Sequence, residues 1–182
     1  MSRDEINRMI SEGVFTSRGL FSNIDEFFER GIAMMRIRTA TVADAESLHD
    51  LYHNHLTSNP PKELQDMAIW REKITRFEND PLYHLLVGEV DGIIVSSVTL
   101  IVIENLTHNT RPYAVIENVV TNAAHRGNHY ATALMNKASE IAAEYGCYKI
   151  MLMTGSKKES TLHFYEYCGY NRNDKTGFVK WI

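Results

Sequence analysis

The sequence predicts an α/β (α+β) fold in which a mixed β-sheet carries helices on its faces. Two apolar runs in the first half are joined by Asp91-Gly92, a dipeptide typical of a tight hairpin between antiparallel strands. The second half alternates strand, helix and strand, which requires a crossover connection. Together these two patterns exclude a pure Rossmann domain.

Length and composition predict a single domain with its own core. The chain has 182 residues, of which 44% are hydrophobic and 23% charged, close to a globular average. The net charge of −4 and the lack of a dense Lys/Arg run argue against nucleic acid as a partner. Two cysteines form no disulfide framework, and no apolar run approaches the roughly 18 residues of a membrane span. We therefore expect a soluble, cytoplasmic protein that binds neither nucleic acid nor a membrane.

Residues 1–33 are predicted to be a helical extension, separate from a main domain over 34–182. A capping box begins at Ser2, and a second helical stretch begins at Ser22. Both helices are too short to be stable alone, so they would dock on the main domain, dock on a partner or fray. We expect docking, although the Met34-Met35 pair leaves open an upstream extension or an alternative start.

The first elements of the main domain follow from alternation and helix-breaking residues. The segment 35–41 alternates apolar and charged residues and predicts a strand. Thr41 or Asp44 caps a helix that reaches about Leu56, after which Asn59-Pro60-Pro61 breaks the chain. The later elements are expected to be a helix over 64–77, strands over 82–90, 93–104 and 113–121, a long helix ending at Gly146, a strand over 148–155, a short helix over 161–169 and a terminal strand over 177–182.

The long helix shows the clearest periodicity in the chain. Its apolar face is formed by Ala133, Leu134, Ala138, Ile141 and Ala142. This spacing predicts that the helix packs one face against the sheet.

The loop before this helix is a candidate anion site. His125-Arg126-Gly127-Asn128-His129 connects a strand to a helix, so backbone N–H groups and the positive end of the helix dipole converge on one point. Such a point suits a pyrophosphate. An ordinary surface turn explains the same residues equally well when the loop is taken alone.

Two motifs in the correct order resemble the GCN5-related N-acetyltransferase (GNAT) superfamily. Arg126, Gly127 and Ala131 match its pyrophosphate loop, and about 40 residues later HFYEYCGY matches its Phe-Tyr-Glu-x-x-Gly-aromatic motif. The departure is His129, which stands where the family has its inner glycine. The resemblance implies a mostly antiparallel sheet and acetyl-CoA as cosubstrate. It also implies a pyrophosphate cradle made of Arg126, Gly127, Asn128, His129, Tyr130 and Ala131.

Glu117 interrupts an apolar pattern in the strand over 113–121. Strict alternation places it on one face with Val115 and Val119, so it is either a salt-bridged scaffold residue or a base beside a cleft, the reading we favour. The resemblance implies that this glutamate accepts the amine proton. It further implies that the backbone of Val119, Val120 and Thr121 contacts the thioester and pantetheine, with the Val119 N–H as oxyanion donor.

Tyr165 is the acid that the resemblance implies. A phenol stays protonated at neutral pH, and its ordinary pKa is close to that of a thiol leaving group. Tyr167 competes for the role, and an aromatic residue packed on the sheet is the structural alternative. Cys168 is expected to be an inert buried thiol.

The histidines of the first predicted helix argue against a metal site. His53 and His55 are two residues apart, which places their rings on different helix faces. The resemblance places the segment 53–63 beside the acceptor pocket, whereas a solvated loop is the alternative. Trp70, Phe77, Tyr83 and Tyr113 are expected to be core or pocket wall, because no basic stripe accompanies them.

These inferences predict an N-acetyltransferase that transfers acetyl from acetyl-CoA directly to a primary amine, with a small molecule favoured as acceptor. The alternative is a non-catalytic CoA-binding regulatory or assembly protein, suggested by His129 and by the apolar extension. A homodimer is compatible with exposed strand edges or with residues 1–33. The sequence does not identify the acceptor.

Overall fold

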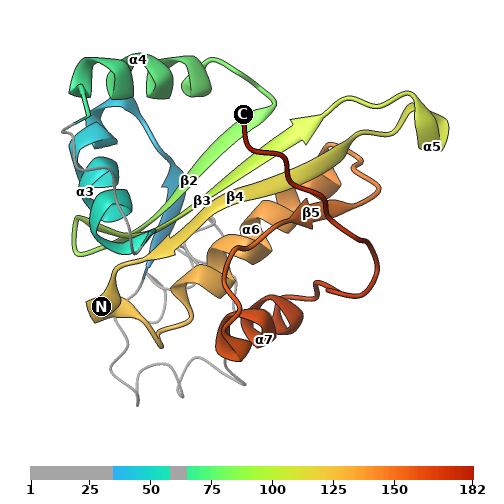
Figure 1. Cartoon of the computed structure of the whole chain (residues 1–182). Coiled ribbons are helices and arrows are strands. Elements are labelled where there is room, and N and C mark those ends of the chain that lie inside the picture. The colour runs from blue at the N-terminus through green and yellow to red at the C-terminus, as the bar shows by residue number, and fades with distance from the viewer. Residues whose placement is uncertain (1–34, 58–64) are drawn as a thin grey trace, which may run out of the picture.

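The fold is built on a five-stranded sheet with the strand order β1-β2-β3-β4-β5. The computed structural model describes residues 35–57 and 65–182, so the helices expected within 1–33 lie outside the described residues. The first three strand pairs are antiparallel and β4 pairs with β5 in parallel, which confirms a mixed, mostly antiparallel sheet (Figure 1). The strands are β1 (Arg36–Thr39), β2 (Tyr83–Val90), β3 (Ile93–Ile103), β4 (Tyr113–Thr121) and β5 (Ile150–Leu152).

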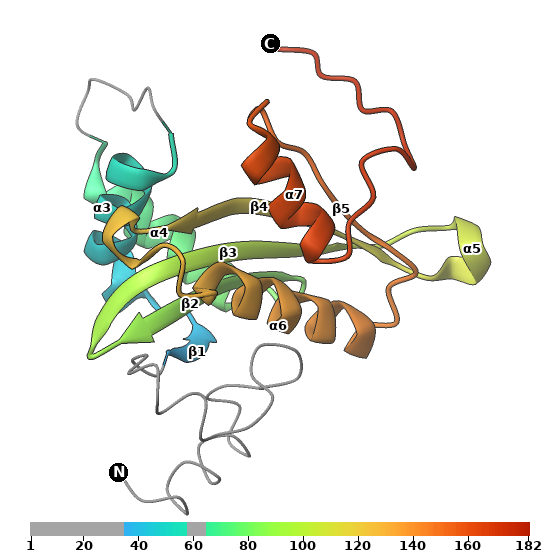
Figure 2. The same cartoon turned by 90° about the horizontal axis from the view of Figure 1, so that it is seen from below.

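Helices cover both faces of this sheet. Helices α3 (Ala45–His55) and α4 (Met67–Glu78) lie on one face, and α6 (Tyr130–Glu144) and α7 (Glu159–Tyr167) lie on the other (Figures 1 and 2). Short turns complete the order, namely η1 (Val42–Asp44), α5 (Thr107–Thr110) and η2 (Ala123–His125). The chain therefore forms three layers, with the sheet in the middle.

Local sequence explains where several elements begin and end. Asp91 and Gly92 both have positive φ, at 51° and 78°, as the predicted tight hairpin between β2 and β3 requires. The Asp66 carboxylate accepts a hydrogen bond from the Ala68 N–H at 2.8 Å and caps α4, which begins at Met67, three residues later than expected. Gly146, with φ 71°, ends α6 as predicted.

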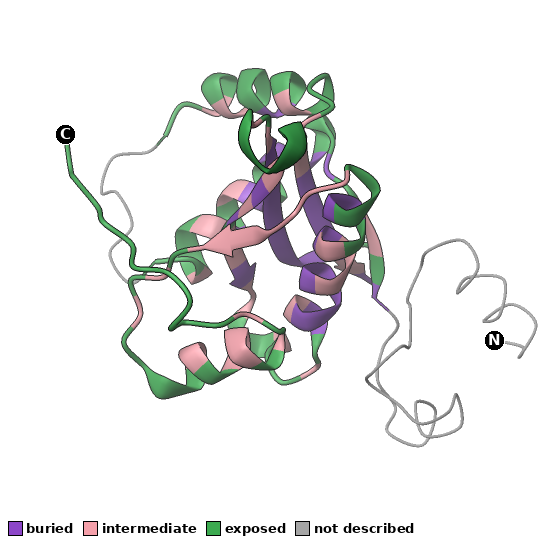
Figure 3. Cartoon of the chain, turned by 90° about the vertical axis from the view of Figure 1, so that its right-hand side faces the viewer, coloured by how far each residue is buried: buried purple, intermediate pink, exposed green. Residues whose placement is uncertain are grey.

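The core consists of two clusters separated by the sheet. On the α6 face, Leu134 and Ile116 are no more than 1% exposed, and all five predicted apolar positions of α6 are buried. On the α3–α4 face, Leu48 and Val87 form the centre of a smaller cluster. Figure 3 shows that the buried residues gather between the layers, while the outer sides of the helices are exposed.

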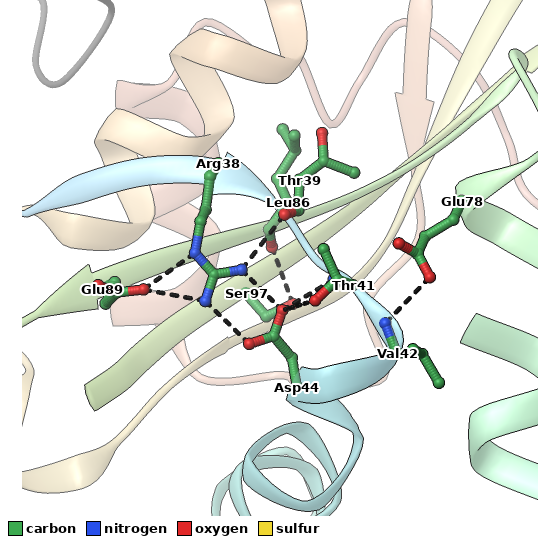
Figure 4. Close-up of polar contacts among 9 residues, drawn as sticks. All are labelled: Arg38, Thr39, Thr41, Val42, Asp44, Glu78, Leu86, Glu89 and Ser97. Atoms are coloured by element: carbon green, nitrogen blue, oxygen red, sulfur yellow. Dashed lines mark hydrogen bonds and ion pairs between the residues drawn. The ribbon is translucent and has the colours of Figure 1, made fainter. Parts of the chain in front are cut away.

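A charged network holds β1, β2 and the start of α3 together (Figure 4). The Arg38 guanidinium donates to both Asp44 oxygens, at 2.6 and 2.8 Å, and to Glu89 at 2.9 Å. The Thr41 N–H also donates to Asp44, at 2.8 Å. The hydrogen bonds from Arg38 lower the pKa of Asp44 below its ordinary value, because they favour the carboxylate over the acid. Thr41 and Asp44, the two predicted caps, thus form a capping box together at this helix start.

Two strand expectations at the C-terminal end need correction. Residues 177–182 form no strand, and Phe178 and Trp181 are each 91% exposed. The β-favouring composition of this segment does not produce a strand, because it pairs with no neighbouring strand among the described residues. β5 is also shorter than the predicted 148–155. Within the part of the chain that the structure describes, no helix is long and apolar enough to cross a bilayer.

Candidate active site

The centre of the site is a bulge in β4. The register between β3 and β4 shifts after Thr99, which pairs with Glu117, so that Ser97 pairs with Val120. Asn118 sits in this shift with φ 53°, a left-handed conformation that asparagine tolerates better than most residues. The bulge therefore inserts an extra residue and turns the rest of the strand.

This bulge overturns the alternation that was expected for β4. Val119 packs against the α6-side cluster together with Ile116, whereas Val120 is buried in the cluster under α3 and α4. Glu117 is exposed, and Asn118 lines a cavity on the α3–α4 face. Glu117 and Val119 thus do not share a face, because the extra residue reverses the order of side chains after position 117.

β4 also loses its neighbour on the β5 side at this point. Among the described residues the parallel ladder pairs Ala114, Val115 and Ile116 with β5, and it stops there. Residues 117–121 continue beyond the last β5 pair (Figure 2). Backbone groups on this edge of β4 are therefore available to an extended ligand.

The predicted phosphate loop is tied to β4 and to α3. The Arg126 guanidinium donates to the Thr121 carbonyl oxygen at 3.2 Å and to the His55 carbonyl oxygen at 3.5 Å. The Ala123 N–H donates to His55 Nδ1 at 3.4 Å, and the Asn128 amide donates to the His125 carbonyl oxygen at 3.1 Å. These contacts fix the loop directly before α6.

Two residues of this loop have left-handed backbones. Gly127 has φ 83°, and His129 has φ 60° as the residue that caps α6. The His129 side chain is exposed, whereas the Tyr130 side chain is 5% exposed and belongs to the α6-side core. Tyr130 can therefore meet a ligand only through its backbone, unlike His129.

Tyr165 lies on α7 and packs against the α6-side cluster. Burial raises the pKa of its phenol above the ordinary value of 10, and the charges of Cys168 and Glu117 raise it further. Tyr167, its competitor from the sequence, is 63% exposed. Tyr165 is thus the half-buried tyrosine of the pair, and the charge of Glu117 acts on it. Burial also raises the pKa of the Cys168 thiol, which fits an inert residue.

A cavity of about 470 Å³ lies between the sheet and α3 and α4, which we call the acceptor pocket. The pocket lies next to the bulge of β4. Asn118 of the bulge lines it, and so does Thr99, which pairs with Glu117 of β4. Tyr83, another lining residue, has its pKa raised by burial and also by the charge of Glu117. The remaining lining residues are Leu48, Tyr52, Gln65, Asp66, Ile69, Trp70, Lys73, Ile74, Phe77 and Leu85.

Sequence reasoning identified Trp70, Phe77 and Tyr83 as core or pocket wall, and they line the pocket. Tyr113 lies elsewhere, against Tyr148. Leu48 and Tyr52 of α3 and Lys73 of α4 also line the pocket, and sequence analysis did not single them out. The helical spacing of Trp70, Lys73 and Phe77 on one face of α4 could have revealed it.

The histidines near the pocket have structural contacts. His49 stacks on His53 and meets the edge of Trp70, and His55 holds the loop before α6. Within residues 35–57 and 65–182, no group of three or more His, Cys, Asp or Glu side chains is placed to hold a metal ion. Residues 58–63 of the segment expected beside the acceptor pocket lie outside the described residues.

Known proteins share both this fold and these sequence patterns. Residues 44–170 match the acetyltransferase (GNAT) family. A glucosamine 6-phosphate N-acetyltransferase of Trypanosoma brucei brucei is 29% identical over 150 residues, covering 79% of this chain and 94% of the relative. A structure of a putative acetyltransferase from Agrobacterium tumefaciens is 35% identical, with a TM-score of 0.73 over 80% of this chain and 99% of the other. A structure described as a transcriptional regulator from Bacillus halodurans is 25% identical, with a TM-score of 0.70 over 81% and 99%.

The family match spans most of the chain and includes β4, the loop before α6 and Tyr165. The fold, the strand that carries Glu117 and the order of the two motifs agree with it. The chain therefore belongs to the acetyltransferase (GNAT) family and is an N-acetyltransferase of the acetyl-CoA-dependent class.

Proposed function

We propose that this protein transfers the acetyl group of acetyl-CoA to the primary amine of a small molecule, by direct attack without a covalent enzyme intermediate. The observation that supports it best is the position of Glu117 at the β4 bulge. Glu117 pairs with Thr99 and precedes Asn118, two residues that line the acceptor pocket, and its charge acts on Tyr83 and on Tyr165. The proposed base on β4 thus neighbours the pocket lining, and its charge reaches the proposed acid on α7.

The loop before α6 fits the pyrophosphate of CoA. By helix geometry the first N–H groups of α6 have no acceptor within the helix, and no other atom lies within 4 Å of the position that a Cβ would take at the left-handed Gly127. The Arg126 guanidinium donates to two backbone carbonyl oxygens and so holds the loop in place. Its proposed role is to position the loop as well as to place a positive charge near the pyrophosphate. The cosubstrate supplies an activated acetyl thioester, and the unpaired edge of β4 from Glu117 to Thr121 can align it.

Two proton transfers are assigned to side chains. Glu117 accepts the proton that the amine loses as its nitrogen bonds to the acetyl carbon, directly or through one water. The Val119 N–H, on the bulged and unpaired part of β4, donates to the carbonyl oxygen as negative charge develops there. The carbon–sulfur bond breaks, and Tyr165 gives its phenolic proton to the sulfur. Its raised pKa keeps the phenol protonated until this step.

The acceptor is proposed to be a small molecule because the pocket is bounded by helices α3 and α4. Its volume of about 470 Å³ lies within the usual range for small-ligand sites. Glucosamine 6-phosphate, named for the Trypanosoma relative, is one primary amine of this size.

Steady-state release of CoA thiol, measured with acetyl-CoA and a panel of primary amines, tests the assignment. Glu117→Gln and Tyr165→Phe should each lower kcat by about 10²–10⁴-fold, the range of general acid–base catalysis. Tyr167→Phe on the same helix and Glu104→Gln beyond the end of β3 are matched controls that should retain activity. Unchanged turnover in both site variants would refute the roles. Tight CoA binding by a wild type that acetylates no amine would favour the regulatory alternative.

A further inference from the structure

The walls of the acceptor pocket are aromatic and fixed in place. The rings of Tyr52 and Trp70 meet edge to face with centroids 5.7 Å apart, and Phe77 stacks on Tyr83 at 3.8 Å. The Tyr52 hydroxyl shares a hydrogen bond with Ser97 Oγ at 3.2 Å, which anchors its ring to the sheet. These contacts present rigid apolar surfaces to an occupant.

The charges around the pocket do not favour an anion. Among the described residues that line it, Asp66 and Lys73 carry the only formal charges, and these cancel. The neighbouring cation Arg71 is paired with Glu46. A phosphate dianion is usually bound by several cationic or N–H donors, so it would be poorly compensated here.

The N-terminus of α4 reinforces this conclusion. A helix N-terminus is the natural place for an anion, but here the Asp66 carboxylate occupies it and accepts from the Ala68 N–H. The negative charge at this end of the pocket repels phosphate and attracts an ammonium group. Glu117, beside Thr99 in the pairing register, places a second negative charge by the pocket.

We propose that the acceptor is a primary amine on an apolar body of aromatic-ring size, and not a sugar phosphate. The inference rests on the proposed function for the reaction itself, but it concerns the pocket and can be tested by binding alone. The amine lies at the Glu117 end, and the apolar body lies between α4 and the sheet. The protein thus differs in acceptor class from relatives that are named for glucosamine 6-phosphate.

Tryptophan fluorescence provides a direct binding test. The chain has two tryptophans, and Trp181→Phe leaves Trp70 in the pocket wall as the single reporter. In this background, titration with 2-phenylethylamine should change the emission with a Kd at least about tenfold below that of glucosamine 6-phosphate, since burial of one apolar ring contributes that much or more. An equal or tighter Kd for the sugar phosphate would overturn the inference.

Lys73→Met should change the affinities for the two ligand classes in opposite directions. Loss of this cation should tighten 2-phenylethylamine binding, because repulsion of the ammonium group is removed, and should weaken any binding of glucosamine 6-phosphate. Phe77→Ala should weaken 2-phenylethylamine binding by about tenfold. Glu72→Gln, exposed on α4 and outside the pocket lining, is the matched control. Weaker 2-phenylethylamine binding in Lys73→Met would count against the proposal.

Turnover of the same two amines separates this inference from the proposed function. If 2-phenylethylamine binds at Trp70 but releases no CoA from acetyl-CoA, the acceptor class stands and the catalytic proposal fails. If the sugar phosphate is acetylated with the higher kcat/KM, the catalytic proposal stands and the acceptor class fails. A higher kcat/KM for 2-phenylethylamine supports both.

Discussion

The two faces of the sheet are both apolar, but they are filled to different degrees. Helix α6 has eight buried residues among its fifteen, whereas α4 has one, Ile74, among its twelve. The face under α6 is a closed core, and the face under α3 and α4 encloses the acceptor pocket. The difference shows how one sheet can support stability on one side and ligand binding on the other.

β4 connects these two faces through its bulge. Val119 contributes to the closed side and Asn118 to the pocket side, although the two residues are adjacent. A rigid core behind β4 therefore holds the backbone at which we expect the reaction to occur. Preorganised N–H groups are effective only when their supporting structure does not move.

Truncation on the closed face should give the largest loss of stability. Leu134 is 0% exposed in α6, so Leu134→Ala should lower the free energy of unfolding by about 2–5 kcal/mol. Ile69 on α4 is 51% exposed and lines the pocket, so Ile69→Ala should change stability by no more than about 0.5 kcal/mol. Equilibrium urea denaturation measures both. Similar losses for the two variants would contradict the division between the faces.

Regular patterns explain why this division was partly visible in the sequence. The five apolar positions predicted for α6 are all buried, because one helical stripe facing a sheet is a local property of the sequence. The hairpin at Asp91-Gly92 and the bounds of β4 are equally local. The pocket is not a local property of the sequence, because its walls come from α3, α4 and three strands that meet only in the folded chain.

The bulge shows a second limit of sequence reasoning. Asn118 was assigned to a regular strand, since its left-handed backbone depends on the register with β3 and not on its neighbours in sequence. The expected terminal strand at 177–182 failed for a related reason. Its residues favour a strand, but a strand also needs a partner edge, which the sequence does not reveal.

The junction of β1 with α3 should give an intermediate effect. Arg38→Met would leave Asp44 and Glu89 without their shared cation and should cost about 1–3 kcal/mol of unfolding free energy at neutral pH. Arg36→Met, exposed on the same strand, is the control. Urea denaturation again gives the comparison, and an effect no larger than that of the control would exclude a stabilising role.

The pH dependence of this effect has a defined sign. Because Arg38 lowers the pKa of Asp44 in the folded state, the carboxylate stabilises the protein above its ordinary pKa of 3.8. That contribution is lost as the pH falls through the lower, folded-state pKa. The difference between wild type and Arg38→Met should therefore be constant at neutral pH and shrink in strong acid. A difference that grows in acid would assign the effect to another group.

The smallest effect is expected where α6, the helix of the closed face, meets the cofactor loop. His129 has φ 60°, a conformation that costs an L-residue about 1–2 kcal/mol and costs glycine little. His129→Gly should therefore raise stability by at most about 1 kcal/mol, because the greater freedom of unfolded glycine offsets part of the relief. His129→Ala retains the backbone cost and should not stabilise.

The same pair of variants separates two roles of His129 at the pyrophosphate. If the side chain keeps the phosphates from the backbone, His129→Gly should tighten acetyl-CoA binding by about threefold or more, measured by calorimetry, and His129→Ala should do so less. If the ring itself donates to a phosphate, both variants should bind more weakly. Unchanged affinity in both would place the pyrophosphate away from this loop. The cradle proposed at the start of α6 would then be wrong, even though the helix and the closed face behind it would be unaffected.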